Sequence, residues 1–189
     1  MFRKIQFSEL SLECCYNRSR VVSAEAYSSG SEKVRRATMT KEQWPYNLPI
    51  WRRFYRAPSP NGQRMAQVDP ATEIGMSNPT SGMLCVTGGP HIERCNPSFI
   101  WSDDSRYLAV PQFHGFFGRQ RVLVVAFDEK GVFASKQREW YFQPESFSNG
   151  QLVVRINPSS KSTHVTTFNI PSDLSTRFTT LRGGWPRGA

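Results

Sequence analysis

Two cysteines and a histidine in the middle of the chain are the residues best suited to metal chemistry. Cys85, His91 and Cys95 offer thiol and imidazole groups, which are the usual ligands of zinc. Their spacing lacks the close cysteine pair typical of structural zinc sites, and no fourth ligand lies nearby in the sequence. Buried thiols are the interpretation we favour, and we expect no metal and no cofactor.

The sequence contains equally few candidate residues for acid–base or nucleophilic catalysis. Asp103 and Asp104 are adjacent carboxylates, but they lie in a turn sequence whose short side chains bond their own backbone. His114 and His164 stand in no serine-hydrolase or zinc-protease motif. The chain also has no glycine-rich phosphate-binding motif ending in Lys-Ser or Lys-Thr. We therefore expect a protein that is not an enzyme.

Binding chemistry is concentrated in the segment Phe113–Arg121. Three phenylalanines lie there beside arginines, and Gly115 and Gly118 allow a close approach by another molecule. Aromatic and arginine side chains supply most of the affinity in protein interfaces. The alternative is that the three rings fold back onto the core or pack against a neighbouring blade. The partner-binding residues predicted in this segment are Phe113, His114, Phe116, Phe117, Arg119 and Arg121.

A second segment, Trp51–Arg56, interleaves aromatic rings with cations that could stack on nucleic-acid bases. The alternative is that strand alternation turns one set of side chains inward and the other toward water. Arg52, Arg53 and Tyr55 complete the predicted partner-binding residues.

Strands and tight turns must position these segments. Tyr107–Val110 and Val122–Phe127 are apolar arms on either side of the two glycines, so they predict a β-hairpin, with a third arm at Ser98–Trp101. Val122–Ala126 is apolar at five consecutive positions. Such a run indicates a strand that is covered on both faces.

A turn sequence recurs along the chain. Ser59-Pro60-Asn61-Gly62 and Ser102-Asp103-Asp104-Ser105 both precede an apolar arm, and 43 residues separate the two serines. A looser third copy is Phe147–Val154. A period of about 40–45 residues with four short strands in each unit is typical of propeller blades.

The pattern resembles the Ser-Pro-Asp-Gly-Lys/Arg turn of TolB-like and WD-repeat β-propellers, over about Trp51 to Ile170. The resemblance implies an all-β fold of antiparallel, propeller-like sheets. Three units are fewer than the ~4 or more blades of a closed ring, so an open or incomplete propeller is expected. We predict one domain, 1–189, with an irregular N-terminal segment (1–50), about three units (51–170) and a C-terminal tail (171–189).

Composition and charge limit the partner and the compartment. The net charge of +9 suits an acidic protein or nucleic acid, although scattered basic residues also serve solubility. Adjacent Cys14 and Cys15 are awkward for two disulfides, and the first residues lack the apolar core of a signal peptide. No run of about 18 apolar residues occurs, so no membrane span is expected. A cytoplasmic protein with free thiols is predicted.

Elimination leaves a non-enzymatic protein-binding module. A small basic domain of this kind fits an inhibitor of another protein, such as an immunity protein that neutralises a toxin, with an acidic partner. The alternatives are a basic nucleic-acid-binding module, which we rank lower, and a hydrolase-like enzyme on a propeller face. Self-association is the structural competitor to a foreign partner, because three units leave strand edges that either the N-terminal segment or another chain must cover.

Overall fold

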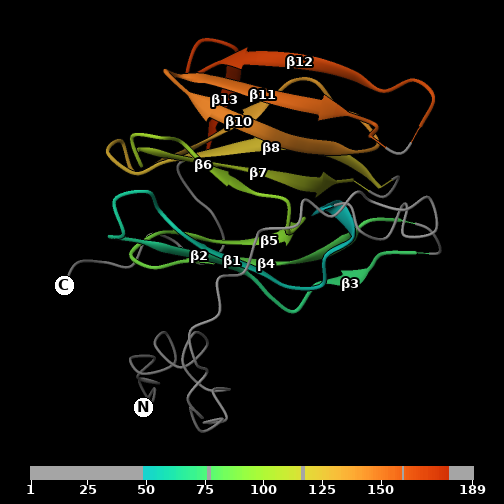
Figure 1. The fold of residues 1–189 in the computed structure, drawn as a ribbon, viewed down its shortest axis with the longest axis horizontal. Coiled ribbons are helices and arrows are strands. Elements are labelled where there is room, and N and C mark those ends of the chain that lie inside the picture. Colours follow the sequence, from blue (N-terminus) through green and yellow to red (C-terminus); the bar gives the residue numbers. More distant parts are fainter. Residues whose placement is uncertain (1–48, 76–77, 116–117, 159, 179–189) are drawn as a thin grey trace, which may run out of the picture. The chain divides into compact units, whose positions relative to one another are not determined.

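A computed structural model describes residues 49–75, 78–115, 118–158 and 160–178 (Figure 1). These residues form thirteen β-strands and one 3-10 turn, η3 (Pro49–Trp51), and contain no α-helix. Every strand pairing among them is antiparallel. The predicted all-β, antiparallel fold class is thereby confirmed. None of the described residues forms a helix that has the length and apolar character of a membrane span.

The first strands form an antiparallel meander. In order of pairing they are β1 (Tyr55–Pro58), β2 (Met65–Val68), β4 (Thr80–Val86) and β5 (His91–Cys95), and the two-residue β3 (Thr72–Glu73) pairs with β4. Side chains alternate in burial along these strands, so one face of the meander is apolar and turned toward the next strands.

The middle strands contain the predicted hairpin. They are β6 (Ile100–Trp101), β7 (Tyr107–His114), β8 (Arg119–Ala126) and β9 (Gly131–Ser135), and β13 (Leu174–Phe178) adds to the far side of β9. One residue pair, Cys95 with Gln112, joins β5 to β7 and makes a single ten-stranded sheet. The strand β13 lies in the stretch that sequence assigned to a tail; its Leu174 is buried.

The last strands form a separate three-stranded sheet, β10 (Phe142–Ser148), β11 (Gln151–Ile156) and β12 (His164–Asn169). It lies over β7 and β8 on the side away from β2 and β4 (Figure 1). Leu152 and Val154 of β11 point into the core. Val153, which lies between them, is only half-buried because strand alternation turns it to the opposite face.

Two apolar clusters hold the layers together and share the middle strands. Leu123 and Val125 pack with residues of β2, β4 and β5. Val122 and Val124 pack on the other side, with residues of β10, β11 and β12. All of Val122–Ala126 is buried, as the apolar run predicted.

The repeated turn has the same hydrogen bonds at its first occurrence and at its second. In the first turn, the Ser59 hydroxyl accepts the N–H of Arg64 at 3.0 Å and donates to Oδ1 of Asn61 at 2.8 Å. Gly62, at the corner, has a φ of 70°. This left-handed backbone region favours glycine.

In the second turn, the Ser102 hydroxyl accepts the N–H of Tyr107 at 2.9 Å and donates to Oδ1 of Asp104 at 2.7 Å. Ser105 occupies the corner with a φ of 62°. The bond from Ser102 helps to hold the pKa of Asp104 below its usual value, against the opposing effect of desolvation. Asp104 is therefore a turn residue, in agreement with its place in the repeat.

The third copy differs from the other two. Asn149 and Gly150 form a two-residue connection between β10 and β11, with φ values of 49° and 73°. Such connections favour Asn-Gly because both residues need a positive φ. The looser sequence match therefore reflects a shorter turn.

Candidate binding site at the end of the β7–β8 hairpin

The hairpin register places polar side chains side by side at its open end. His114 pairs with Arg119, and Gln112 pairs with Arg121. Paired residues of an antiparallel ladder point to the same face. Farther along the strand, the same face carries Leu123 of the apolar cluster. The polar side chains at the open end of the hairpin therefore lie on the core-facing side of the sheet, just past the last apolar residues.

A short bridge brings a third stretch of chain next to this end. Gln120 N–H donates to Glu139 O at 2.6 Å, and Glu139 N–H donates back to Gln120 O at 3.1 Å. The residues on either side of such a pair also face each other. Arg138 and Trp140 therefore lie next to the arginines of β8, and the Arg119 guanidinium is 5.4 Å from the Trp140 ring centre.

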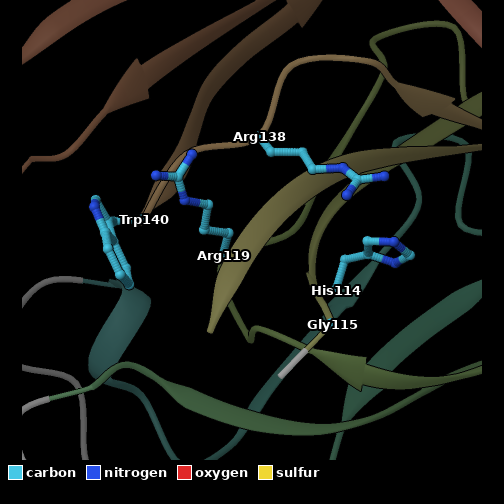
Figure 2. A pocket seen from close by; sticks show the side chains of 5 residues that line it. All are labelled: His114, Gly115, Arg119, Arg138 and Trp140. Carbon is cyan, nitrogen blue, oxygen red and sulfur yellow. The ribbon is translucent and has the colours of Figure 1, made fainter. Parts of the chain in front are cut away.

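These residues surround an open cavity of about 400 Å³. Figure 2 shows Arg119 directed toward Trp140 and Arg138 directed toward His114. We call this site the cationic concavity. It is lined by His114, Gly115, Arg119, Arg138 and Trp140.

The charges of the concavity are only partly compensated. Arg94, Arg119 and Arg138 form no ion pair with any residue in the described part of the chain. Trp140 lies beside Arg119 with 47% of its surface exposed. An exposed indole among uncompensated cations suits a ligand with anionic groups and some apolar surface.

The pKa values of the site reflect burial and the neighbouring cations. Desolvation lowers the pKa of His114, and Arg121, Arg138 and Arg94 lower it further because they repel a second positive charge. Desolvation also lowers the pKa of Arg121, with a contribution from Arg138. A bound anion would offset this repulsion.

Hydrogen bonds fix the walls of the concavity. Arg94 donates to Gly115 O at 2.9 Å, so β5 is tied to the hairpin tip. Arg121 donates to Oε1 of Gln112 through Nε at 3.0 Å and Nη2 at 2.8 Å. Gln112 in turn donates to Glu93 O at 3.0 Å. These bonds hold the hairpin side of the concavity in place, which limits the entropy lost on binding.

The side chains that line the concavity are two guanidinium groups, an imidazole and an indole. Of the described residues that line it, none is a Ser, Thr, Cys, Asp or Glu. His114 is the only histidine among the described residues that line it.

The structure brings together some of the residues that the sequence predicted. His114 and Arg119 line the concavity, and Arg121 lies directly beside it. Phe113 is 2% exposed because alternation turns its ring to the opposite face of β7, so it does not extend the site. Phe116 and Phe117 lie outside the described residues.

The Trp51–Arg56 residues belong to a different place. Arg52 and Tyr55 line a separate depression of about 170 Å³, with the Arg52 guanidinium 5.0 Å from the Tyr55 ring centre. Arg53 is exposed, and its carbonyl accepts the N–H of Ala71 at 3.0 Å. These residues do not contribute to the lining of the concavity.

Sequence reasoning missed Arg94, Arg138 and Trp140. The triplet Arg138-Glu139-Trp140 is itself a small basic and aromatic signal. Its relevance depends on the pairing of Glu139 with Gln120, which no local pattern indicates.

The cysteine and histidine residues considered for zinc are split between two faces. Cys85 and His91 are paired neighbours on β4 and β5. Cys95 lies in the apolar cluster, where burial raises its pKa. Both cysteines are free thiols, and no group of metal-ligating side chains occurs among the residues that the structure describes.

The structure is that of an all-β protein with an open cavity lined by cationic and aromatic side chains. Comparison of the chain with protein-family models, with curated proteins and with solved structures found no match.

Proposed function

We propose that this chain is a non-enzymatic protein-binding module that takes an acidic segment of its partner into the cationic concavity. The observation that carries this proposal is the presence of Arg119 and Arg138 without carboxylate partners among the described residues, beside exposed Trp140. Carboxylates bind guanidinium groups through charge-assisted hydrogen bonds. Apolar side chains of the partner would cover the indole.

The arginines and the tryptophan would contribute to binding in different ways. Charge complementarity would speed the encounter, and Trp140 would supply much of the affinity once it is desolvated. Phe116 and Phe117 stay predicted contributors from the hairpin tip. An inhibitor of another protein, such as an immunity protein that neutralises a toxin in the cytoplasm, is the form of this proposal that the sequence favours.

The architecture that we propose for this role is an open, propeller-like stack of three units. Its support is the identical hydrogen bonding around Ser59 and Ser102 at the start of successive units. The sheets of such a stack present their connections along common edges, where binding residues can gather.

One observation favours nucleic acid as a second candidate. An exposed tryptophan beside arginines can stack on a base while the cations contact phosphates. Salt distinguishes the two candidates, since phosphate contacts release counterions and binding then falls steeply as salt rises.

The test is affinity capture from native lysate with three baits, each used with and without nuclease. The baits are the natural chain, Trp140→Ala with Arg138→Glu, and Lys161→Glu as a matched surface control. We expect a protein captured by the natural chain and by the control, lost with the double variant, and insensitive to nuclease. Capture that nuclease abolishes would overturn the proposal in favour of nucleic acid. Equal capture by all baits would remove the concavity from the proposal.

A further inference from the structure

The strand β12 is an edge strand of the three-stranded sheet among the residues that the structure describes. Its far side pairs with no described strand, because the chain turns after Asn169 and the next strand, β13, pairs with β9. The pairing of β12 with β11 runs over six consecutive residues without a register shift. A regular edge of this kind is a template for another strand.

The backbone groups on this edge can be assigned from the ladder. Ile170 N–H donates to Gly150 O across the β11 side at 2.7 Å. Alternate residues of an antiparallel strand direct their N–H and C=O groups to opposite sides. The groups of Val165, Thr167 and Asn169 therefore point away from β11.

One end of the edge is already capped within the chain. Asn169 N–H donates to Oδ2 of Asp173 at 2.7 Å, and Asn169 O accepts the N–H of Asp173 at 2.9 Å. The N–H and C=O groups of Val165 and Thr167 make up the rest of the edge, and they have no hydrogen-bond partner among the described residues.

The other edges carry features that discourage pairing. β1 has four residues and includes Arg56 and Pro58. β10 includes Pro144 and a register shift at that point, and β13 has a shift against β9. Proline, charge and bulges are the usual means of protecting an edge. β12 has none of these.

The charge of the chain also favours this edge as a contact between copies. Two molecules of net charge +9 repel each other over most of their surfaces. The stretch 162–172 contains no Asp, Glu, Lys or Arg. Two β12 strands can therefore approach without placing like charges opposite each other.

We propose that β12 pairs with β12 of a second copy, antiparallel and about a two-fold axis at Thr166. In this register Val165 of one copy faces Thr167 of the other, and all their outward N–H and C=O groups find partners. An axis at Thr167 would instead pair Val165 with Asn169 of the other copy. The N–H and C=O groups of Asn169 are already bonded to Asp173. An axis at Val165 would pair Thr167 with Thr163, which lies outside the strand.

The side chains fit this arrangement. Val165 is 54% exposed and would contact Thr167 across the new pair. Thr166 would face its own copy as a non-hydrogen-bonded pair. Contacts between β-branched residues on facing strands are favourable. The product is one continuous six-stranded sheet, a closed isologous dimer that leaves the cationic concavity of each copy available.

Cysteine cross-linking tests the register. Facing Cα atoms of a non-hydrogen-bonded pair are about 4.5 Å apart, which is within the range of a disulfide. Under mild oxidation, Thr166→Cys should form at least five-fold more disulfide dimer than Thr167→Cys or the natural chain. The natural chain controls for its own cysteines. Equal cross-linking in all three would overturn the register.

Charge exchange at the same position tests the contact itself by sedimentation. Thr166→Glu and Thr166→Lys should each be monomeric, because like charges would face each other across the axis, and their mixture should regain the dimer. Thr167→Pro should also abolish dimers without unfolding, since that N–H is not used in the ladder with β11, whereas Thr167→Val should dimerise normally. Dimers that persist in Thr167→Pro would overturn the proposal. Exchange-protected Val165 and Thr167 amides in a monomeric natural chain would overturn it as well, because another part of the chain would then cover the edge.

Discussion

The backbone N–H of Asn61 donates to the hydroxyl of Ser105 at 3.0 Å, across 44 residues of sequence. The donor lies in the first copy of the repeated turn and the acceptor in the second. Farther along, Asp103 N–H donates to Phe147 O at 3.0 Å, and Phe147 begins the third copy. The turns that define the repeat in the sequence are thus bonded to one another in the fold.

The link between turns should contribute measurably to stability. Ser105→Ala removes the acceptor of Asn61 N–H and should lower the free energy of unfolding by ~1 kcal/mol. Ser105→Gly removes the same hydroxyl but relieves a positive φ, which costs L-residues about 1–2 kcal/mol. The glycine variant should therefore be the more stable of the two in urea denaturation. Equal stability of Ser105→Ala and the natural chain would show that the link contributes nothing.

The concavity should bind acidic peptide through its arginines and its indole. With fluorescein-labelled oligoglutamate as the probe, Arg138→Glu and Trp140→Ala should each weaken binding at least ten-fold, about 1.4 kcal/mol. Lys161→Glu makes the same change in net charge as Arg138→Glu on an exposed loop. Its effect should be less than two-fold in fluorescence anisotropy. A loss as large for Lys161→Glu would mean that the probe responds to net charge alone.

Binding at the concavity should depend on the protonation of His114. Burial and neighbouring arginines lower its pKa in the free protein, and a bound carboxylate would raise it again. Binding should therefore take up protons, and affinity should increase as the pH falls toward the lowered pKa of His114. His114→Gln should flatten this dependence in calorimetry. A His114→Gln profile as steep as that of the natural chain would assign the proton to another group.

The same shift gives a stability prediction for the unliganded protein. Because the folded pKa of His114 is below the unfolded value, the unfolded state binds the proton more readily as the pH falls below about 6.5. The free energy of unfolding should be highest above that pH and should decrease as the pH falls through the pKa of His114 in the folded protein. Acidic peptide should reduce the decline. Denaturant midpoints measured with and without the peptide provide the check, with His114→Gln as the comparison.

The two described thiols should differ in reactivity. Cys95 lies in the apolar cluster with its pKa raised by burial, whereas Cys85 is half-buried. Only the thiolate reacts with iodoacetamide at an appreciable rate. Peptide mapping should therefore find Cys95 unlabelled in the folded protein and labelled in denaturant, with Cys85 labelled first. Prompt labelling of folded Cys95 would contradict its place in the core.

Much of the fold follows from local patterns. The apolar arms around Gly115 and Gly118 predicted the β7–β8 hairpin, and the apolar run of β8 predicted its burial on both faces. Both signals depend on residues that are close in sequence. The pairing of β13 with β9 instead depends on contacts about 40 residues apart, and nothing in Leu174–Phe178 indicates its partner.

The residues of the candidate site also differ in whether local sequence could predict them. His114 and Arg119 face each other across a short turn, so a local reading could group them. Phe113 was grouped with them by composition, but its position one residue away places it on the other face. Arg138 and Trp140 reach the site through a single bridge between distant segments, which only the fold reveals.

The middle strands β7, β8 and β9 are shared by both apolar clusters. Neither flanking group of strands can separate without exposing one face of this shared layer to water. Fluctuations that open one side are therefore coupled to the integrity of the other, and the layers gain or lose their order together. We expect the protein to melt in one cooperative transition, with the slowest amide hydrogen exchange at Leu123 and Val124.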